Sequence, residues 1–165
     1  MGETETSTTV VCDAGPLIHL DELGALDLLT DFDRLLVPPT VWGEVETHRP
    51  SALAQPAISL LAITPATNPN SYLHTLFQAL SLDTGEREAL LLTQEHPQAL
   101  LITDDAAARL VGELLGFRVH GSIGILIRAI RRRQRTPQEV ISLIERIPTH
   151  SSLHLRPALL EDIVA

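Results

Sequence analysis

The chain has 165 residues, 44% of them hydrophobic, which is typical of one domain with a substantial core. Its formal net charge of −9 argues against a protein that coats nucleic acid non-specifically. No stretch approaches the roughly 20 apolar residues of a membrane span. Residues 1–9 are polar and acidic, unlike a signal peptide. We therefore expect a loose lead-in over residues 1–9, one domain over residues 10–165, and a cytoplasmic protein that does not act with membranes.

Short apolar runs alternate with helical patterns along the chain, an order that predicts βαβ units. In chain order, we expect a strand at 9–12, two short helices within 17–29, a strand at 34–37, a helix at 40–47, a strand at 58–63, helices at 72–80 and 83–96, a strand at 99–103, a helix at 105–115, a strand at 117–119, and helices from 122, over 136–147 and over 157–164. These elements predict an α/β fold, a three-layer α/β/α sandwich with a central, mainly parallel sheet.

Polar residues mark the expected ends of several helices. Thr40 and Ser122 are expected to cap the helices that follow them. The spacing of Asp83 and Glu86 is that of a capping box, as is the run at 136–139. A glycine at position 116 is placed to end the helix over 105–115.

Acidic residues follow two of the expected strands. Asp13 comes directly after Val-Val-Cys, and the pair Asp104-Asp105 comes after the apolar run at 99–103. Glu44 and Glu86 fall where helices should begin. The carboxyl ends of parallel strands face one crevice, where four acids would repel each other unless a divalent cation neutralised them. The pattern therefore predicts a Mg²⁺ or Mn²⁺ site, of the kind that most often serves phosphate chemistry.

Each of these acids also has a local explanation. Asp13 can be a turn residue that caps the next helix, and one of Asp104 and Asp105 can cap the helix after them. Glu44 in a first helical turn suits the helix dipole, and Glu86 can do no more than complete its capping box. Position alone leaves both interpretations open.

Positive charge is concentrated in one segment. Five of the 12 basic residues lie within eight positions on the helix that begins at Ser122: Arg128, Arg131, Arg132, Arg133 and Arg135. They are candidates for contacts with RNA phosphates. The alternatives are a solvated helix face, or pairing with the many acids of the chain.

Five segments in sequence order resemble the PIN domain. They are residues 10–18 (VVCDAGPLI), 37–45 (VPPTVWGEV), 82–90 (LDTGEREAL), 101–109 (LITDDAAAR) and 121–126 (GSIGIL). The likeness extends from about Val10 to Ala165. It is closest to the prokaryotic branch of uncharacterised PIN-like proteins that is related to VapC-type toxins.

The resemblance implies an endoribonuclease that hydrolyses phosphodiesters with Mg²⁺ or Mn²⁺. The acids that match the catalytic residues of the family are Asp13, Glu44, Glu86 and Asp105. The matching metal ligands are Asp13, Asp104, Asp105 and Glu86. The resemblance also implies an RNA substrate, an antitoxin protein as partner if the chain is the toxin of such a pair, and a homodimer.

For the third acid of the family, Asp83 and Glu88 are alternatives to Glu86. The chain also departs from the family pattern after the first acid. Where PIN domains usually carry Ser or Thr and then a small polar residue, this chain has Ala14 and Gly15. A module that binds RNA or a protein without cleaving, or a nuclease acting on DNA, therefore remains an alternative.

Overall fold

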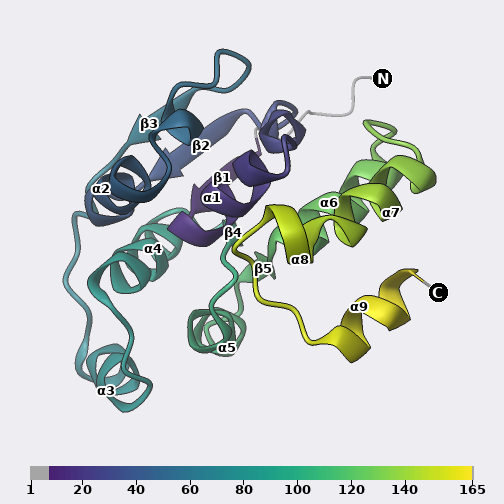
Figure 1. The fold of residues 1–165 in the computed structure, drawn as a ribbon. Coiled ribbons are helices and arrows are strands. Elements are labelled where there is room, and N and C mark those ends of the chain that lie inside the picture. The colour runs from purple at the N-terminus through teal and green to yellow at the C-terminus, as the bar shows by residue number, and fades with distance from the viewer. Residues whose placement is uncertain (1–7, 165) are drawn as a thin grey trace, which may run out of the picture.

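A computed structural model describes residues 8–164 of the chain. Within them, five strands form one parallel sheet in the order β3-β2-β1-β4-β5 (Figure 1). The strands are β1 (Thr9–Cys12), β2 (Arg34–Val37), β3 (Leu60–Ala62), β4 (Leu100–Ile102) and β5 (Arg118–His120). All five lie where the sequence predicted them. The apolar runs form strands because the central ones are buried on both faces, as in β4, where every residue is buried.

Helices cover both faces of the sheet, which confirms the predicted α/β/α sandwich. One face is covered by α1 (Ala14–Glu22), η1 (Leu26–Leu29), α2 (Pro39–His48), α6 (Ser122–Arg131) and α7 (Pro137–Glu145). The other face is covered by α3 (Ser71–Ala79), α4 (Thr84–Glu95) and α5 (Ala106–Leu114). The described residues also include η2 (Pro50–Leu53), α8 (Ile147–His150) and α9 (Pro157–Val164).

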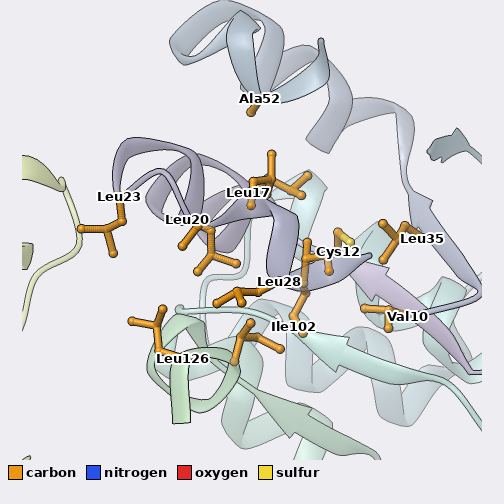
Figure 2. Packing of buried hydrophobic residues seen from close by; sticks show 14 of the residues in the cluster. Val10, Cys12, Leu17, Leu20, Leu23, Leu28, Leu35, Ala52, Ile102 and Leu126 are labelled. Atoms are coloured by element: carbon orange, nitrogen blue, oxygen red, sulfur yellow. The ribbon is translucent and has the colours of Figure 1, made fainter. Parts of the chain in front are cut away.

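A continuous core lies between the sheet and the α1 face. Figure 2 shows Leu20 of α1, Leu28 of η1 and Leu126 of α6 near Ile102 of β4, and all four are fully buried. Each such side chain contributes roughly 1.5–3 kcal/mol relative to an exposed position. Cys12 belongs to the same core, where burial and the nearby Asp13 carboxyl raise the pKa of its thiol. The elements that carry the acids are therefore held by extensive apolar packing.

The strand order creates a crevice between β1 and β4 at the carboxyl edge of the sheet. From β1 the chain winds through β2 and β3 on one side, and it then returns to β4 and β5 on the other. The helices that follow β1 and β4 cover opposite faces, so the two connections diverge at this point. Ligands of open α/β sheets bind at such a switch point. Asp13 and Asp104 follow these two strands closely, so the topology brings them to the crevice.

Two predicted helix-start motifs are confirmed. Asp83 and Glu86 form a capping box at the start of α4, and Thr136 and Glu139 form another at the start of α7. Gly116 follows α5 with φ +81°, a left-handed conformation that costs glycine little. Local sequence therefore fixes these ends.

Two other predicted caps were wrong, because the hydroxyl groups have partners elsewhere in the fold. Thr40 lies inside α2 and donates a hydrogen bond from Oγ1 to Glu88 Oε2 at 3.2 Å. Ser122 is the first residue of α6, whose N-cap is Gly121. The Ser122 hydroxyl donates to Asp104 Oδ2 at 2.6 Å. Both side chains connect elements instead of capping the helix that contains them.

The expected lead-in over residues 1–9 lies outside the described residues, apart from Thr8 and Thr9. The Thr8 N–H donates to Asp33 Oδ2 at 2.6 Å, and Thr9 begins β1. Among the helices of residues 8–164, none combines the length and the apolar character needed to cross a membrane.

Candidate active site at the carboxyl edge of the sheet

A pocket with a volume of about 330 Å³, here called the acidic pocket, opens at the carboxyl edge of the sheet. Its carboxylates come from the ends of β1 and β4, from α2 and from the start of α4. They are Asp13, Glu44, Asp83, Glu86, Asp104 and Asp105. The only basic side chains among the described residues that line it are His19 and His154. The fold thus collects every acid that the sequence predicted for the site into one cavity.

Asp13 is the most deeply placed of these acids, with 7% of its surface exposed. Its Oδ2 accepts a hydrogen bond from Thr103 Oγ1 at 2.7 Å, and its Oδ1 accepts one from the Ala14 N–H at 2.9 Å. Burial raises the pKa of Asp13 to about 6, the two hydrogen bonds oppose this rise, and the carboxylates of Asp83 and Glu44 add to it. Without a cation in the pocket, the protonated form of Asp13 is therefore unusually favoured.

Asp104 and Asp105 are adjacent in sequence but have different surroundings. Asp104 Oδ2 contacts His19 Nδ1 at 2.6 Å and accepts from Ser122 Oγ at 2.6 Å, while its Oδ1 accepts from the Ser122 N–H at 2.7 Å. Burial by itself would raise the pKa of Asp104, but the hydrogen bonds from His19 and Ser122 outweigh burial and hold the pKa below its ordinary value. Because an ionised carboxylate only accepts, His19 Nδ1 carries the proton. Both oxygens of Asp104 are thus occupied by donors from α1 and α6.

Asp105 is the N-cap of α5, and its Oδ2 accepts from the Ala108 N–H at 2.8 Å. Its Oδ1 has no hydrogen-bond donor among the described residues. Of the adjacent pair, Asp105 therefore has an oxygen free for a ligand in the acidic pocket, whereas Asp104 fastens β4 to α1 and α6.

The remaining acids meet where α2 approaches the start of α4. A Cβ atom built on Gly85 would lie 3.6 Å from Asp83 Oδ1 and 3.8 Å from Glu44 Oε2, so these two carboxylates flank the same point. Burial and the Asp83 carboxylate raise the pKa of Glu44, which His48 opposes. The pKa of Glu86 is raised to about 7, mainly by burial. The hydrogen bond that Glu86 accepts from the Asp83 N–H lowers this pKa, whereas the nearby carboxylates raise it; they are those of Asp105, Asp83 and Asp13. The acids of α2 and α4 are therefore within electrostatic reach of those that follow the strands.

Of the three candidates for the third acid, Asp83 and Glu86 line the acidic pocket. Glu88 instead accepts from the Thr40 N–H and hydroxyl, both at 3.2 Å, and so ties α4 to α2. Its carboxylate is used in packing two helices together.

The donor set of the acidic pocket suits a hard divalent cation, because every carboxyl group offers oxygen. Within residues 8–164, however, no three Asp, Glu, His or Cys side chains are already close enough to hold one ion together. Mg²⁺ commonly keeps several waters and binds through one or two carboxylates, so Asp13 and Asp105 fit it without a complete protein cage. Burial, and after it the neighbouring carboxylates, raise the pKa values of Asp13 and Glu86, so a bound cation would favour the ionised form of both side chains.

Sequence reasoning did not assign His19, Thr103 and Gly121 to this site. Thr103 could have been found, since it directly follows the strand that pairs with β1 and so lies next to Asp13. His19 and Gly121 could not, because their roles depend on α1 and α6 meeting at Asp104. A Cβ atom on Gly121 would lie 2.7 Å from Asp104 Oδ1, so only glycine allows this close approach.

The predicted arginine cluster lies away from the acids. α6 begins beside Asp104 and ends at Arg131, about 14 Å further along its axis, toward the amino edge of the sheet. Asp31 binds Arg128 Nη1 at 2.9 Å and Arg132 Nε at 2.8 Å. Arg135 Nη2 donates to both oxygens of Asp27, at 2.9 and 2.8 Å. The structure therefore pairs three of the five arginines with acids of the chain.

The five arginines also divide between two cavities. Arg128, Arg131 and Arg132 line one cavity together with Arg118 of β5. Two further arginines, at positions 133 and 135, line a separate cavity beside the start of α7.

Comparison with known proteins identifies the family of the chain. A search of curated proteins finds no significant match to the chain. A family model described as a PIN domain, DUF3368, matches residues 9–165, which is nearly the whole chain. That span includes the parallel sheet, the switch point and all six carboxylates of the acidic pocket. On this match, the chain belongs to the PIN domain family DUF3368.

Proposed function

We propose that the chain is a Mg²⁺- or Mn²⁺-dependent endoribonuclease whose active site is the acidic pocket. The observation that carries the proposal is the buried Asp13 carboxyl at the switch point, with its pKa raised to about 6 in a pocket shared with five further carboxylates. A cluster of like charges in a cleft is costly to maintain, and such clusters are typical of sites that take up a cation or a proton. Family membership supports a nuclease-type fold.

Within this proposal, Asp105 would hold the cation through its free Oδ1, and Asp13 would hold it through the second lone pair of an oxygen that already accepts one hydrogen bond. A bound divalent cation would supply charge stabilisation for the attacking water and for the leaving oxygen of an in-line displacement. Glu86, which lines the same pocket, would exchange a proton with water beside the ion. Asp104 positions the connection after β4 through His19 and Ser122. Glu44 faces the same space from α2 and orients water or ligands around the ion.

The direct test is cleavage of a labelled single-stranded RNA with Mn²⁺, with EDTA as the metal-free control. We expect Asp13→Asn to lower the rate by about 100-fold or more, because it removes a ligand that acts in the transition state. Glu113→Gln is the matched control, since Glu113 is an exposed carboxylate of α5 that does not line the acidic pocket. Equal Mn²⁺-dependent cleavage by wild type and Asp13→Asn would contradict the proposal.

A second candidate is a PIN module that binds RNA or a protein partner without cleaving. Its support is the absence of a hydroxyl after the first acid: Ala14 is buried and offers Asp13 only its backbone N–H. Calorimetric titration with Mn²⁺ separates the two candidates. The nuclease should take up metal in an Asp13-dependent manner, and the silent module should not.

The proposal includes a biological role, a protein partner and an oligomeric state. A cytoplasmic ribonuclease with this fold is suited to be the toxin of a toxin–antitoxin pair related to VapC, with a homodimer as the active form. An antitoxin would then be its protein partner. Co-purification with a protein encoded next to it, which suppresses the cleavage, would support this setting.

A further inference from the structure

A cavity lined by cationic side chains lies near the amino edge of the sheet, and it is here called the arginine pocket. It has a volume of about 450 Å³, and the described residues that line it include no acid. Its lining residues are Thr8, Phe32, Leu100, Arg118, His120, Arg128, Arg131 and Arg132. In a chain with a net charge of −9, such a concentration of positive charge on one cavity needs an explanation.

The arginine pocket is built from two rigid elements. Arg118 and His120 alternate along β5 and so point to one face of the sheet, while Arg128 and Arg131 lie one helical turn apart on α6. Arg128 is fixed over the Phe32 ring, 4.0 Å from its centroid, and is bound to Asp31. Arg128 is therefore held in place before any ligand arrives, which lowers the entropic cost of binding an anion.

Arg131 differs from its neighbours because its guanidinium makes no hydrogen bond or ion pair with any residue of the described chain. Asp31 binds the Nη1 of Arg128 and the Nε of Arg132, so their other N–H groups stay available. Arg118 uses one N–H, from Nη2, to reach the Gln98 carbonyl at 2.9 Å. The pocket thus presents several guanidinium donors and an excess of positive charge, a combination that favours phosphate.

A second cavity, here called the connecting cavity, lies between the arginine pocket and the acidic pocket. Its volume is about 360 Å³. It shares His120 with the arginine pocket, and it shares Asp104, Leu153 and His154 with the acidic pocket. Arg109 of α5 also lines it. The three cavities therefore adjoin one another along α6, over a distance of about 14 Å.

The walls of the connecting cavity suit a nucleotide chain better than a free anion. Ile127 and Leu159 line it with 42% and 46% of their surfaces exposed, although large apolar side chains are usually covered. Sites for single-stranded nucleic acid combine cationic groups that follow the backbone with side chains that contact the bases. Here the exposed aliphatic side chains of Ile127 and Leu159 offer the surface for the bases. A double helix would hold its bases away from that apolar surface.

From this arrangement we infer that an RNA strand bound at the acidic pocket continues along β5 and α6 and places phosphates in the arginine pocket. The inference deepens the proposed ribonuclease function and rests on it. Arg131 contacts a phosphate distant from the cleaved bond, and its contribution is to substrate binding. Arg133 does not contact this RNA strand, because Arg133 lines a different cavity.

The test compares Arg131→Gln with Arg133→Asn. Arg133 is exposed and has φ +58°, which asparagine tolerates, so this control removes the same charge without new strain. Binding of a fluorescein-labelled single-stranded RNA is measured by anisotropy in EDTA, so that no cleavage occurs. We expect Arg131→Gln to raise Kd roughly tenfold and to reduce the slope of log K against log salt by about 0.7. The control should match wild type within about twofold.

Cleavage kinetics with Mn²⁺ provide the second readout. Arg131→Gln should raise KM for a long RNA and leave kcat unchanged, whereas a dinucleotide substrate, too short to reach the arginine pocket, should be cleaved equally by both variants. Equal binding by the two arginine variants, or inorganic phosphate competing as strongly as the RNA, would overturn the inference. RNA binding that depends on Arg131 in a protein without cleavage would support the inference and refute the nuclease. Cleavage of the long RNA with the same KM and kcat in wild type and Arg131→Gln would support the nuclease and refute the inference about the arginine pocket.

Discussion

At the scale of single residues, the adjacent acids Asp104 and Asp105 differ in how many of their carboxylate oxygens already accept hydrogen bonds. Asp104 receives three short hydrogen bonds, and Glu88, which lies outside the pocket, is committed to Thr40. Asp105 keeps one oxygen without a hydrogen-bond donor, and it lines the same pocket as Asp13 and Glu86. Adjacent acids in a sequence motif can therefore have different tasks, one in structure and the other in ligand binding.

A matched pair of substitutions tests this division. Asp105→Asn should change the free energy of unfolding by less than about 0.5 kcal/mol, because asparagine is as good an N-cap as aspartate. Asp104→Asn should cost roughly 2–4 kcal/mol, because an amide cannot accept all three hydrogen bonds and the partners on α1 and α6 are partly buried. Urea unfolding in EDTA measures both values. The same cost for both variants would show that the two acids are equivalent.

The sequence predicted the identity of the acids but not which oxygens are free. The apolar runs and the parallel topology suffice to bring Asp13 and Asp105 to one edge, because strand ends are readable from local patterns. The contacts of Asp104 with His19 and Ser122 join segments 85 and 18 residues away, and no local pattern encodes them. The prediction that these acids ligate a metal stays a prediction.

At the scale of elements, helix ends were predictable where the cap lies within the same segment. The capping boxes of α4 and α7 depend on residues three positions apart, and both are present. Thr40 and Ser122 were assigned wrongly because each hydroxyl has a better acceptor on another element. Tertiary hydrogen bonds override a local capping preference when the acceptor is a carboxylate held close by packing.

Two glycines, one in α2 and one before α6, should respond in opposite ways to alanine. Gly43 lies inside α2, and a Cβ atom added there would have nothing within 4 Å, so Gly43→Ala should stabilise the fold by about 0.5–1 kcal/mol. Gly121→Ala should destabilise it by roughly 1–3 kcal/mol, since the Cβ would lie 2.7 Å from Oδ1 of Asp104, whose carboxylate is held in place by three hydrogen bonds. Thermal unfolding followed by circular dichroism measures whether each variant is more or less stable than wild type. A stabilising Gly121→Ala would mean that α6 is not held tightly against Asp104.

At the scale of the whole molecule, charge is separated along α6. The acids lie at its start and the free guanidinium groups near its end. This separation was implicit in the sequence, since a helix that follows a parallel strand starts at the carboxyl edge and returns toward the amino edge. The cluster of arginines at the end of such a helix therefore belongs to the edge opposite the acids. The sequence alone did not place Arg118 in this cluster, because Arg118 joins the other arginines only when β5 packs beside α6 in the fold.

The raised pKa values predict how stability depends on pH. The folded protein binds more protons than the unfolded chain between the ordinary and the raised pKa values, so stability should fall as pH rises from about 4 to 7. For Asp13, a rise in pKa from 3.8 to about 6 corresponds to roughly 3 kcal/mol. The lowered pKa of His120, caused by burial and by the nearby arginines, acts in the opposite direction. The contribution of Asp13 therefore has to be isolated by comparison with a variant.

Unfolding is accordingly followed at pH 5 and pH 8 in EDTA for wild type and Asp13→Asn. Wild type should lose more stability than the variant over this interval, and Mn²⁺ should restore more stability at pH 8 than at pH 5. The same pH dependence in both proteins would show that the Asp13 carboxyl does not titrate in this range.

The position of β5 has a consequence for how copies of this chain can associate. β5 is an edge strand of the sheet, is only three residues long and carries the charged Arg118. Short edge strands that carry charge resist backbone pairing with another molecule. Joining two sheets through β5 would also set two cationic cavities next to each other, at an electrostatic cost that grows as ionic strength falls. A homodimer of this protein would therefore have to avoid the β5 edge, which would leave the cationic end of each molecule open to solvent.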